Sequence, residues 1–218
     1  ITQTAATLLN VGTGTVALTT PTTGASSIGA VGVPILTTAD TITAAAGSGG
    51  VFITETNGAS FTATATGAGP ITLTSTTGTL TVATPIATGS GAITLASGDA
   101  VTLNANVGGA GSGTVTINTN TNGAGADSFT MNPGSSITTS NATAGAVAIN
   151  VNAAAGGTGT AALQNITTGS GGTITVATNT GVNATGGSIN QAAGTLLNAG
   201  AGTVALVTPA GASASGIG

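Results

Sequence analysis

The stretch from Gly69 to Thr138 decides the fold, because it contains four copies of one short pattern in which apolar residues alternate with small polar ones. The copies read Gly69-Pro70-Ile71-Thr72-Leu73, Gly91-Ala92-Ile93-Thr94-Leu95, Gly113-Thr114-Val115-Thr116-Ile117 and Ser135-Ser136-Ile137-Thr138. The lead residues Ile71, Ile93, Val115 and Ile137 follow one another at intervals of 22 positions. A fixed period of this length is typical of stacked structural repeats.

Alternation at period two places Ile71 and Leu73 on one face of a strand and Thr72 on the other. One such strand buries too little apolar area to fold alone, but strands stacked at a fixed period bury a continuous core. Weaker alternating segments lie between the strong copies, at Leu80-Thr81-Val82, Val101-Thr102-Leu103 and Phe129-Thr130-Met131. The sequence therefore predicts an all-β protein, a β-solenoid of about 22 residues per coil with two or three short strands in each coil.

A second, longer repeat joins the two ends of the chain. Residues 1–27 match residues 189–215 at sixteen of 27 positions, and Ile28-Gly29 returns as Ile217-Gly218 after one inserted residue. We therefore expect residues 1–218 to form a single continuous solenoid segment, with 1–29 and 189–218 as equivalent copies of a 188-residue tandem unit. At the period of the short repeat, such a unit would hold eight or nine coils. The chain starts at Ile1, so we expect a processed product or a window of a longer array.

The composition excludes several classes of function. The 218 residues include no Lys, Arg, His, Cys, Trp or Tyr, and four acids give a net charge of −4. Without cations the chain cannot neutralise phosphates, so no nucleic-acid partner is expected. Without Cys there is neither a disulfide framework nor a thiolate site. Thr or Gly interrupts every apolar run, so no transmembrane helix and no membrane span are expected. The mean hydropathy of +0.50 and low charge favour a folded chain over a disordered one.

The four acids are the only candidates for metal binding or acid–base catalysis: Asp40, Glu55, Asp99 and Asp127. Glu55 and Asp99 are separated by twice the 22-residue period, which would place them about 9–10 Å apart if they are in register. That separation is too wide for a shared calcium ion, although paired-carboxylate glycosidases can be as widely spaced. No base, cation or aromatic platform accompanies the pair. We therefore predict no catalytic, cofactor-binding or metal site and no enzyme activity, with Asp99 and Asp127 as turn residues.

Three further motifs have a structural and a functional interpretation. The run Gly108–Gly113 has the glycines of a phosphate loop, but no Lys and no helix follow it, so we interpret it as a turn. Asn residues concentrate at strand ends, where they tolerate left-handed turns and form stacked amide ladders; they are Asn104, Asn106, Asn118, Asn120 and Asn122. The pattern Asn-x-Thr, a glycosylation acceptor, occurs at Asn141, Asn165 and Asn183, where chance matches are expected.

The abundant threonines allow two interpretations. Stacked outward Thr residues can form hydroxyl ladders along a solenoid. A flat Thr-x-Thr array could instead order water, as in ice-binding solenoids. The spacing slips after the fourth copy, because Val147, Ile174 and Val204 follow one another at longer and unequal intervals. A face that drifts in this way would match an ice lattice poorly, so the structural interpretation is preferred.

Residues 28–58 carry a resemblance to a known family. They contain Ile28-Gly29, Pro34-Ile35-Leu36 and Gly49-Gly50-Val51-Phe52-Ile53-Thr54-Glu55-Thr56-Asn57-Gly58. With the many Gly-x-Val/Ile-Thr-Leu/Ile strands, this arrangement is similar to the repeats of filamentous-haemagglutinin-like and related giant bacterial surface proteins. The resemblance implies a right-handed parallel β-helix in an extracellular or cell-surface fibre or adhesin stalk, with no catalytic residues to carry over. The chain departs from that family in lacking Lys and Arg entirely, which favours a bare shaft.

From these observations we expect a structural protein, the shaft of a fibre, whose partner is a further copy of itself, end to end or side by side. The alternatives are an adhesin segment that binds a carbohydrate or a host surface, and a Thr-rich ice-binding solenoid.

Overall fold

The computed structural model describes residues 1–218 except 124, 153–157, 180–185 and 210–214. The described residues form strands joined by turns, and no helix occurs among them. The strands are β1 (Leu9–Thr19), β2 (Ser27–Ile28), β3 (Ile35–Ala46), β4 (Gly50–Glu55), β5 (Ala59–Ala65), β6 (Ile71–Ser75), β7 (Leu80–Val82), β8 (Ala87–Thr88), β9 (Ile93–Ser97), β10 (Val101–Leu103), β11 (Val107–Gly108), β12 (Val115–Thr119), β13 (Phe129–Met131), β14 (Ser136–Thr138), β15 (Val147–Val151), β16 (Ala161–Leu163), β17 (Asn165–Thr167), β18 (Ile174–Thr178), β19 (Gly187–Gln191), β20 (Leu197–Asn198), β21 (Val204–Val207) and β22 (Ser215–Ile217).

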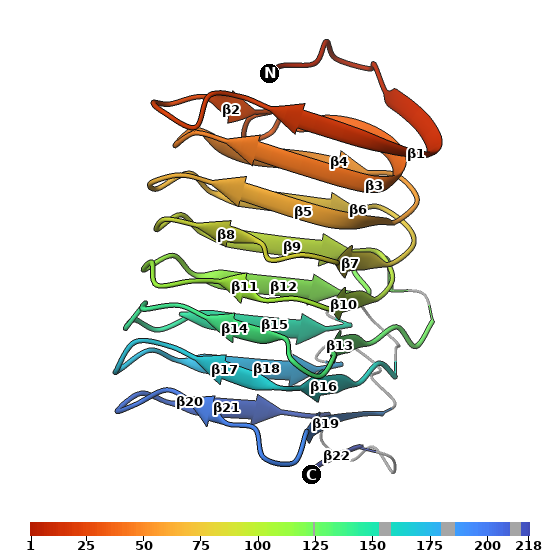
Figure 1. Ribbon diagram of the computed structural model, residues 1–218. Coiled ribbons are helices and arrows are strands. Elements are labelled where there is room, and N and C mark those ends of the chain that lie inside the picture. Colours follow the sequence, from red (N-terminus) through yellow and green to blue (C-terminus); the bar gives the residue numbers. More distant parts are fainter. Residues whose placement is uncertain (124, 153–157, 180–185, 210–214) are drawn as a thin grey trace.

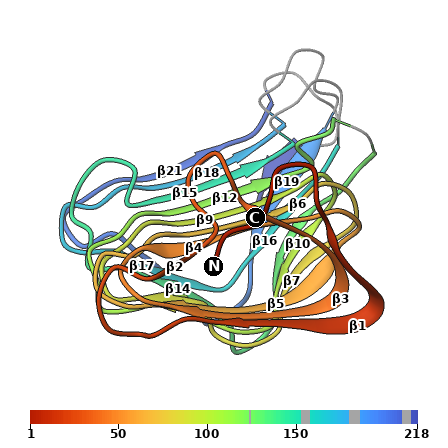
Figure 2. The same ribbon diagram turned by 90° about the horizontal axis from the view of Figure 1, so that it is seen from above.

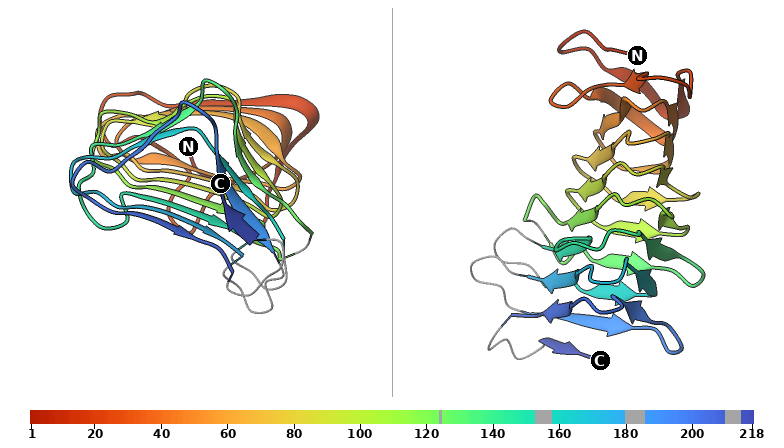
Figure 3. Two further views of the ribbon diagram at one scale, coloured as in Figure 1. Left: turned by 90° about the horizontal axis from the view of Figure 1, so that it is seen from below. Right: turned by 90° about the vertical axis from the view of Figure 1, so that its left-hand side faces the viewer.

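The strands stack coil on coil along one axis, and the two chain ends lie at opposite ends of the stack (Figure 1 and Figure 3). Each coil passes through up to three walls. The first wall contains β2, the start of β3, β4, β6, β9, β12, β15, β18 and β21; the second contains β1, the rest of β3, β5, β7, β10, β13, β16, β19 and β22; the third contains β8, β11, β14, β17 and β20. The strands of successive coils pair in parallel, as β6 does with β9. This arrangement is a parallel β-solenoid, consistent with a parallel β-helix, and the predicted all-β solenoid class is confirmed.

The core consists of columns of inward side chains, each stacked on its counterpart in the next coil. One column of the first wall begins at Ile28 and ends at Val204, and its members within the stack are fully or almost fully buried. In order, its residues are Ile28, Val51, Ile71, Ile93, Val115, Val147, Ile174 and Val204. The second wall carries Ala59, Leu80, Val101, Phe129, Ala161, Ile189 and Ile217 in the same way. Viewed along the axis, the coils lie over one another around a common interior (Figure 2), and the buried columns fill that interior.

The register corrects the 22-residue period at its fourth copy. Ile71, Ile93 and Val115 do stack at the expected interval, but Val115 pairs with Val147 rather than with Ile137. Ile137 belongs to β14 in the third wall, where it pairs with Val107. The later steps of the first-wall column, to Ile174 and to Val204, are also longer than the early ones. Between Ile28 and Val204 the column makes seven steps, so a 188-residue unit spans fewer coils than the eight or nine expected from the sequence.

The additional residues of the longer coils lie at the turns, and the walls therefore stay in register. Between β9 and β10 only three residues intervene, whereas nine residues separate β12 from β13. The next such gap, between β15 and β16, also holds nine residues. A strand that slipped by one residue would turn its apolar side chains outward, so insertions are absorbed where no column passes. The drift that the sequence spacing suggested does not affect the walls.

Between the third and first walls, successive turns approach closely because they contain glycines, which have no side chain. A Cβ atom on Gly91 would overlap the carbonyl oxygen of Gly69, and one on Gly113 would overlap that of Gly91. Next to this row of stacked glycines (Gly69, Gly91 and Gly113), a Cβ atom on Gly111 would overlap the carbonyl oxygen of Gly89. The close packing of successive turns therefore requires glycine at Gly91, before β9, and at Gly113, before β12.

The glycine turn provides a matched pair of substitutions. Gly111→Ala should lower the free energy of unfolding by about 1–3 kcal/mol, because the added methyl group has to displace a packed backbone. Gly109→Ala, in the same turn, meets nothing within 4 Å and should change stability by less than about 1 kcal/mol, in the stabilising direction if at all. Chemical denaturation of both variants, followed by circular dichroism, measures the difference. Equal stabilities would contradict the packing of the turns.

Candidate functional site

The acids occupy different positions from those that the 22-residue period predicts. Glu55 stacks on Ser75, and Ser75 stacks on Ser97, so Asp99 is not in the column of Glu55. Glu55 points inward and is completely buried, whereas Asp99 lies in the turn after β9 and is partly exposed. The two carboxylates therefore do not form the pair that a paired-acid mechanism requires. Asp40 is exposed.

Glu55 is held by neutral donors alone. Its Oε2 accepts a hydrogen bond of 2.6 Å from the Thr37 hydroxyl, and its Oε1 accepts longer bonds of 3.4 Å and 3.2 Å from the backbone N–H groups of Ala39 and Asn57. These donors lie on β3 and in the turn that follows β4, so the carboxylate connects two neighbouring coils. With no exposed surface, Glu55 has no route to a substrate. The geometry assigns it to the structure of this corner.

Asp99 and Asp127 are related in a way that the sequence period did not reveal. Val101 pairs with Phe129, and each acid stands two residues before one of these, so the two carboxylates belong to successive coils. Asp99 accepts hydrogen bonds from the Gly78 N–H at 2.7 Å and from the Asn122 side-chain amide at 3.0 Å. Partial burial, and then the negative charge of Asp99, raise the pKa of Asp127. Ionisation of Asp127 therefore costs the folded state some stability as the pH rises through this pKa.

These two turn acids do not amount to a metal centre. No group of three or more Asp and Glu residues that could hold a metal ion occurs among the described residues. The expectation that Asp99 is a turn residue agrees with its bonds, since its own N–H donates to the Ser97 hydroxyl at 3.2 Å.

A buried corner at the end of the first wall carries three stacked asparagines in the left-handed conformation. Asn120, Asn152 and Asn179 have φ angles of 55°, 55° and 51°, and all three are almost completely buried. The side-chain amide of Asn152 donates to Oδ1 of Asn179 at 2.7 Å, and that of Asn179 donates to the carbonyl of Gly159 at 3.0 Å. Asn120, one of the asparagines predicted at strand ends, thus adopts the left-handed turn conformation, whereas the amide ladder joins Asn152 and Asn179, which were not among the predicted positions. Outward ladders also link Asn118 with Asn150.

Beside these asparagines, the described part of the chain buries several oxygen atoms without a hydrogen-bond partner. They include Oγ1 of Thr119 and Thr178 and Oδ1 of Asn120 and Asn152. Thr119 and Thr178 flank Val151 in one inward column, since Val151 pairs with both. An unpartnered buried hydroxyl loses its hydration without compensation, which costs about 1–3 kcal/mol. In this column, Thr119 and Thr178 therefore each place an unpartnered hydroxyl at the position where Val151 has a methyl group.

Replacing these hydroxyls should stabilise the protein. Thr119→Val and Thr178→Val keep the side-chain shape and should each raise the free energy of unfolding by about 1 kcal/mol. The matched control is Thr139→Val, because the buried Thr139 hydroxyl is bonded to the carbonyls of Gly111 at 3.1 Å and Gly113 at 2.6 Å. That variant should lose about 1–3 kcal/mol. Thermal and denaturant unfolding measure all three, and a loss of stability in Thr119→Val would mean that its hydroxyl has a partner in solution.

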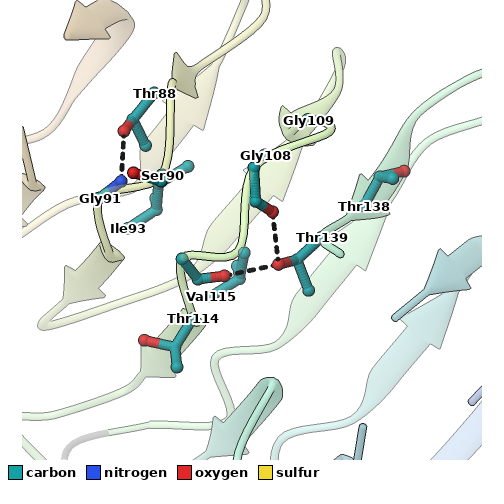
Figure 4. A pocket seen from close by; sticks show the side chains of 12 residues that line it. Thr88, Ser90, Gly91, Ile93, Gly108, Gly109, Thr114, Val115, Thr138 and Thr139 are labelled. Atoms are coloured by element: carbon teal, nitrogen blue, oxygen red, sulfur yellow. Dashed lines mark hydrogen bonds between the residues drawn. The ribbon is translucent and has the colours of Figure 1, made fainter. Parts of the chain in front are cut away.

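The glycine-rich run Gly108–Gly113 begins at the last residue of β11 and continues through the turn that leads to β12, as interpreted from the sequence. Together with Thr88, Thr138 and Thr139 it lines a small hollow (Figure 4). The cavity volume is about 10 Å³, room for one water molecule at most. The Gly109 N–H is already bonded to the carbonyl of Thr138 at 2.8 Å. This turn therefore offers no cradle for a phosphate group.

Two of the three glycosylation patterns lie in the described part of the chain. The side-chain amide of Asn141 donates to the carbonyl of Ser112 at 2.7 Å, and its Oδ1 accepts from the Thr143 hydroxyl at 2.7 Å. Asn165 lies in β17, and its Oδ1 accepts a hydrogen bond from the Leu196 N–H at 2.9 Å. Asn183 falls outside the described residues. Both described asparagines thus have structural hydrogen bonds.

Two larger hollows lie at the ends of the stack. At the C-terminal end, Leu163, Ile189, Leu206 and Ile217 help to line a hollow of about 360 Å³. At the N-terminal end, a hollow of about 180 Å³ is lined by residues 3–6 together with residues 32–34 and Leu36. There the side-chain amide of Gln3 is bonded to both backbone groups of Leu36. Among the described residues, the large apolar side chains that are exposed lie near these ends.

Comparison with protein-family models, with curated proteins and with solved structures gives no match. Among the described residues, no helix has the length and apolar character to cross a membrane.

Proposed function

We propose that this protein is structural: a segment of a fibre shaft, extracellular or on a cell surface, without catalytic activity. The observation that carries the proposal is the continuous stacking of buried apolar columns from one end of the chain to the other. Each coil completes the backbone hydrogen bonds of the next, so length is added without any new type of contact. The resemblance to filamentous-haemagglutinin-like repeats supports the extracellular location and a right-handed winding.

The side walls support a passive role. Their outward residues include many small hydroxyl, amide and methyl groups, such as the stacked Thr72, Thr94 and Thr116. The chain has no Lys or Arg, so trypsin has no site to cut. Carbohydrate sites commonly combine aromatic surfaces with polar groups, and Phe52, the aromatic residue on the outward side of the first wall, is 7% exposed.

One observation favours ice binding as a second candidate. The strands of the first wall keep their register through the insertions, so the drift expected from the sequence does not arise. However, Ala96 follows Thr74 in the parallel file, and Ala148 follows Thr116, so the array is not a uniform Thr lattice. Thermal hysteresis of the purified chain tests this candidate, and glycan arrays test the adhesin alternative.

The shaft proposal predicts how a longer chain behaves. Residues 30–218 appended after Gly218 would make a second unit, since Gly218 is the counterpart of Gly29. Electron microscopy of this tandem chain should show one rod of unchanged width, longer by about 35 Å, the rise of about seven coil steps at about 4.8 Å each. Two separate globules joined by a linker, or hydrolysis of a glycan by the single unit, would overturn the proposal.

A further inference from the structure

The large apolar side chains that are exposed among the described residues lie near the two ends of the chain. They are Ile1, Leu8, Leu9, Val11, Val31, Val33, Leu196, Val204, Val207 and Ile217. The terminal coils, residues 1–28 and 189–217, contain no Asp or Glu. Each end therefore presents an apolar surface free of charged side chains, bordered by the unpaired edges of its last strands.

The two terminal coils share their local structure as well as their sequence. In both copies an Asn side chain accepts a hydrogen bond of 3.0 Å from the N–H two residues further on, at Gly12 and at Gly200. These glycines have φ angles of 57° and 56°. The turn before them also recurs, since the hydroxyls of Thr7 and Thr195 donate to the carbonyl three residues earlier, at 2.7 Å and 2.6 Å.

The copies differ in their place in the stack. Val16 pairs with Ile42 in the second wall, whereas its counterpart Val204 pairs with Ile174 in the first. One copy has a coil only on its C-terminal side, and the other has a coil only on its N-terminal side. The two copies therefore contact their neighbouring coils from opposite sides and in different walls.

Corresponding residues show this relation directly. Ile28 is completely buried because it pairs in parallel with Val51, while its counterpart Ile217 is 55% exposed. At the other end Leu9 is 39% exposed, while its counterpart Leu197 packs against the core and pairs in parallel with Ile166. Within residues 1–218, Ile217 is thus paired on one side alone, with Ile189, and the exposed Leu9 lies at the opposite end of the stack.

We infer that the C-terminal end of one copy binds the N-terminal end of a second copy, head to tail, with the terminal coils paired in parallel. This inference rests on the proposed shaft function and names its partner. The C-terminal hollow and the exposed Ile217 would be covered by the first coil of the next copy. Because such a contact uses two different surfaces and the solenoid axis does not close on itself, repetition gives a filament. The missing acidic and basic side chains remove charge repulsion from the contact.

The test uses variants that block one end each. Leu8→Asp with Val11→Asp blocks the N-terminal end, and Val204→Asp with Ile217→Asp blocks the C-terminal end; all four residues are exposed, so folding should survive, as circular dichroism will check. Light scattering coupled to size-exclusion chromatography should show oligomers of the unmodified chain. Each blocked variant alone should run as a 19.7 kDa monomer. Thr64→Asp, exposed in mid-stack, should associate like the unmodified chain.

Mixing the two blocked variants separates head-to-tail from symmetric contacts. One free N-terminal end and one free C-terminal end remain, so the mixture should form a 1:1 dimer and stop there. A dimer of either blocked variant by itself would show a symmetric contact and overturn the inference. A folded, unmodified chain that stays monomeric at concentrations of hundreds of micromolar would also overturn it. That last result would leave the shaft proposal standing, since the tandem chain described above tests it separately.

Discussion

The structure depends on the parallel hydrogen-bonded ladder between successive coils. Because a side chain in a strand points inward or outward by alternation, a coil can bury its apolar residues only if its strands meet those above and below without slipping. The columns from Ile28 to Val204 and from Ala59 to Ile217 satisfy this condition. Everything else that varies along the chain, including coil length, polar corners and glycine turns, lies where no apolar column passes.

The alternation of apolar and polar residues shows which residues form strands and which side chains point inward, and this sets how much of the fold the sequence could predict. It identified β6, β9 and β12 as stacked strands and located β7, β10 and β13 to the residue, since an inward side chain at every second position is visible without a structure. It could not say to which wall a strand belongs. Ile137 is followed by Thr at the expected interval, as Ile71, Ile93 and Val115 are, yet it lies in the third wall, because a long turn after β12 displaced the following strands.

The sequence likewise could not show which of the four acids lie next to each other. Glu55 and Asp99 are separated by twice the period, but their stacking depends on the lengths of individual coils, and Ser97 takes the place that Asp99 was given. Asp99 and Asp127 are neighbours only because an insertion lengthens the coil between them, which the regular period does not reveal. The composition does not depend on the coil lengths: without Lys, Arg, His and Cys, the titratable side chains are four acids whatever the register of the coils.

The register between coils is the claim on which the account rests, and engineered disulfides measure it directly, because the chain has no Cys of its own. Thr116 pairs with Ala148, so Thr116→Cys with Ala148→Cys should form a bridge, the Cα atoms being about 5 Å apart and within the range that disulfides span. Thr116→Cys with Thr138→Cys, at the 22-residue interval, should not, because Thr138 pairs with Gly108 in the third wall. Oxidation followed by mass spectrometry of proteolytic fragments shows whether each of the two cysteine pairs forms a disulfide. A bridge in the second pair and none in the first would contradict the account.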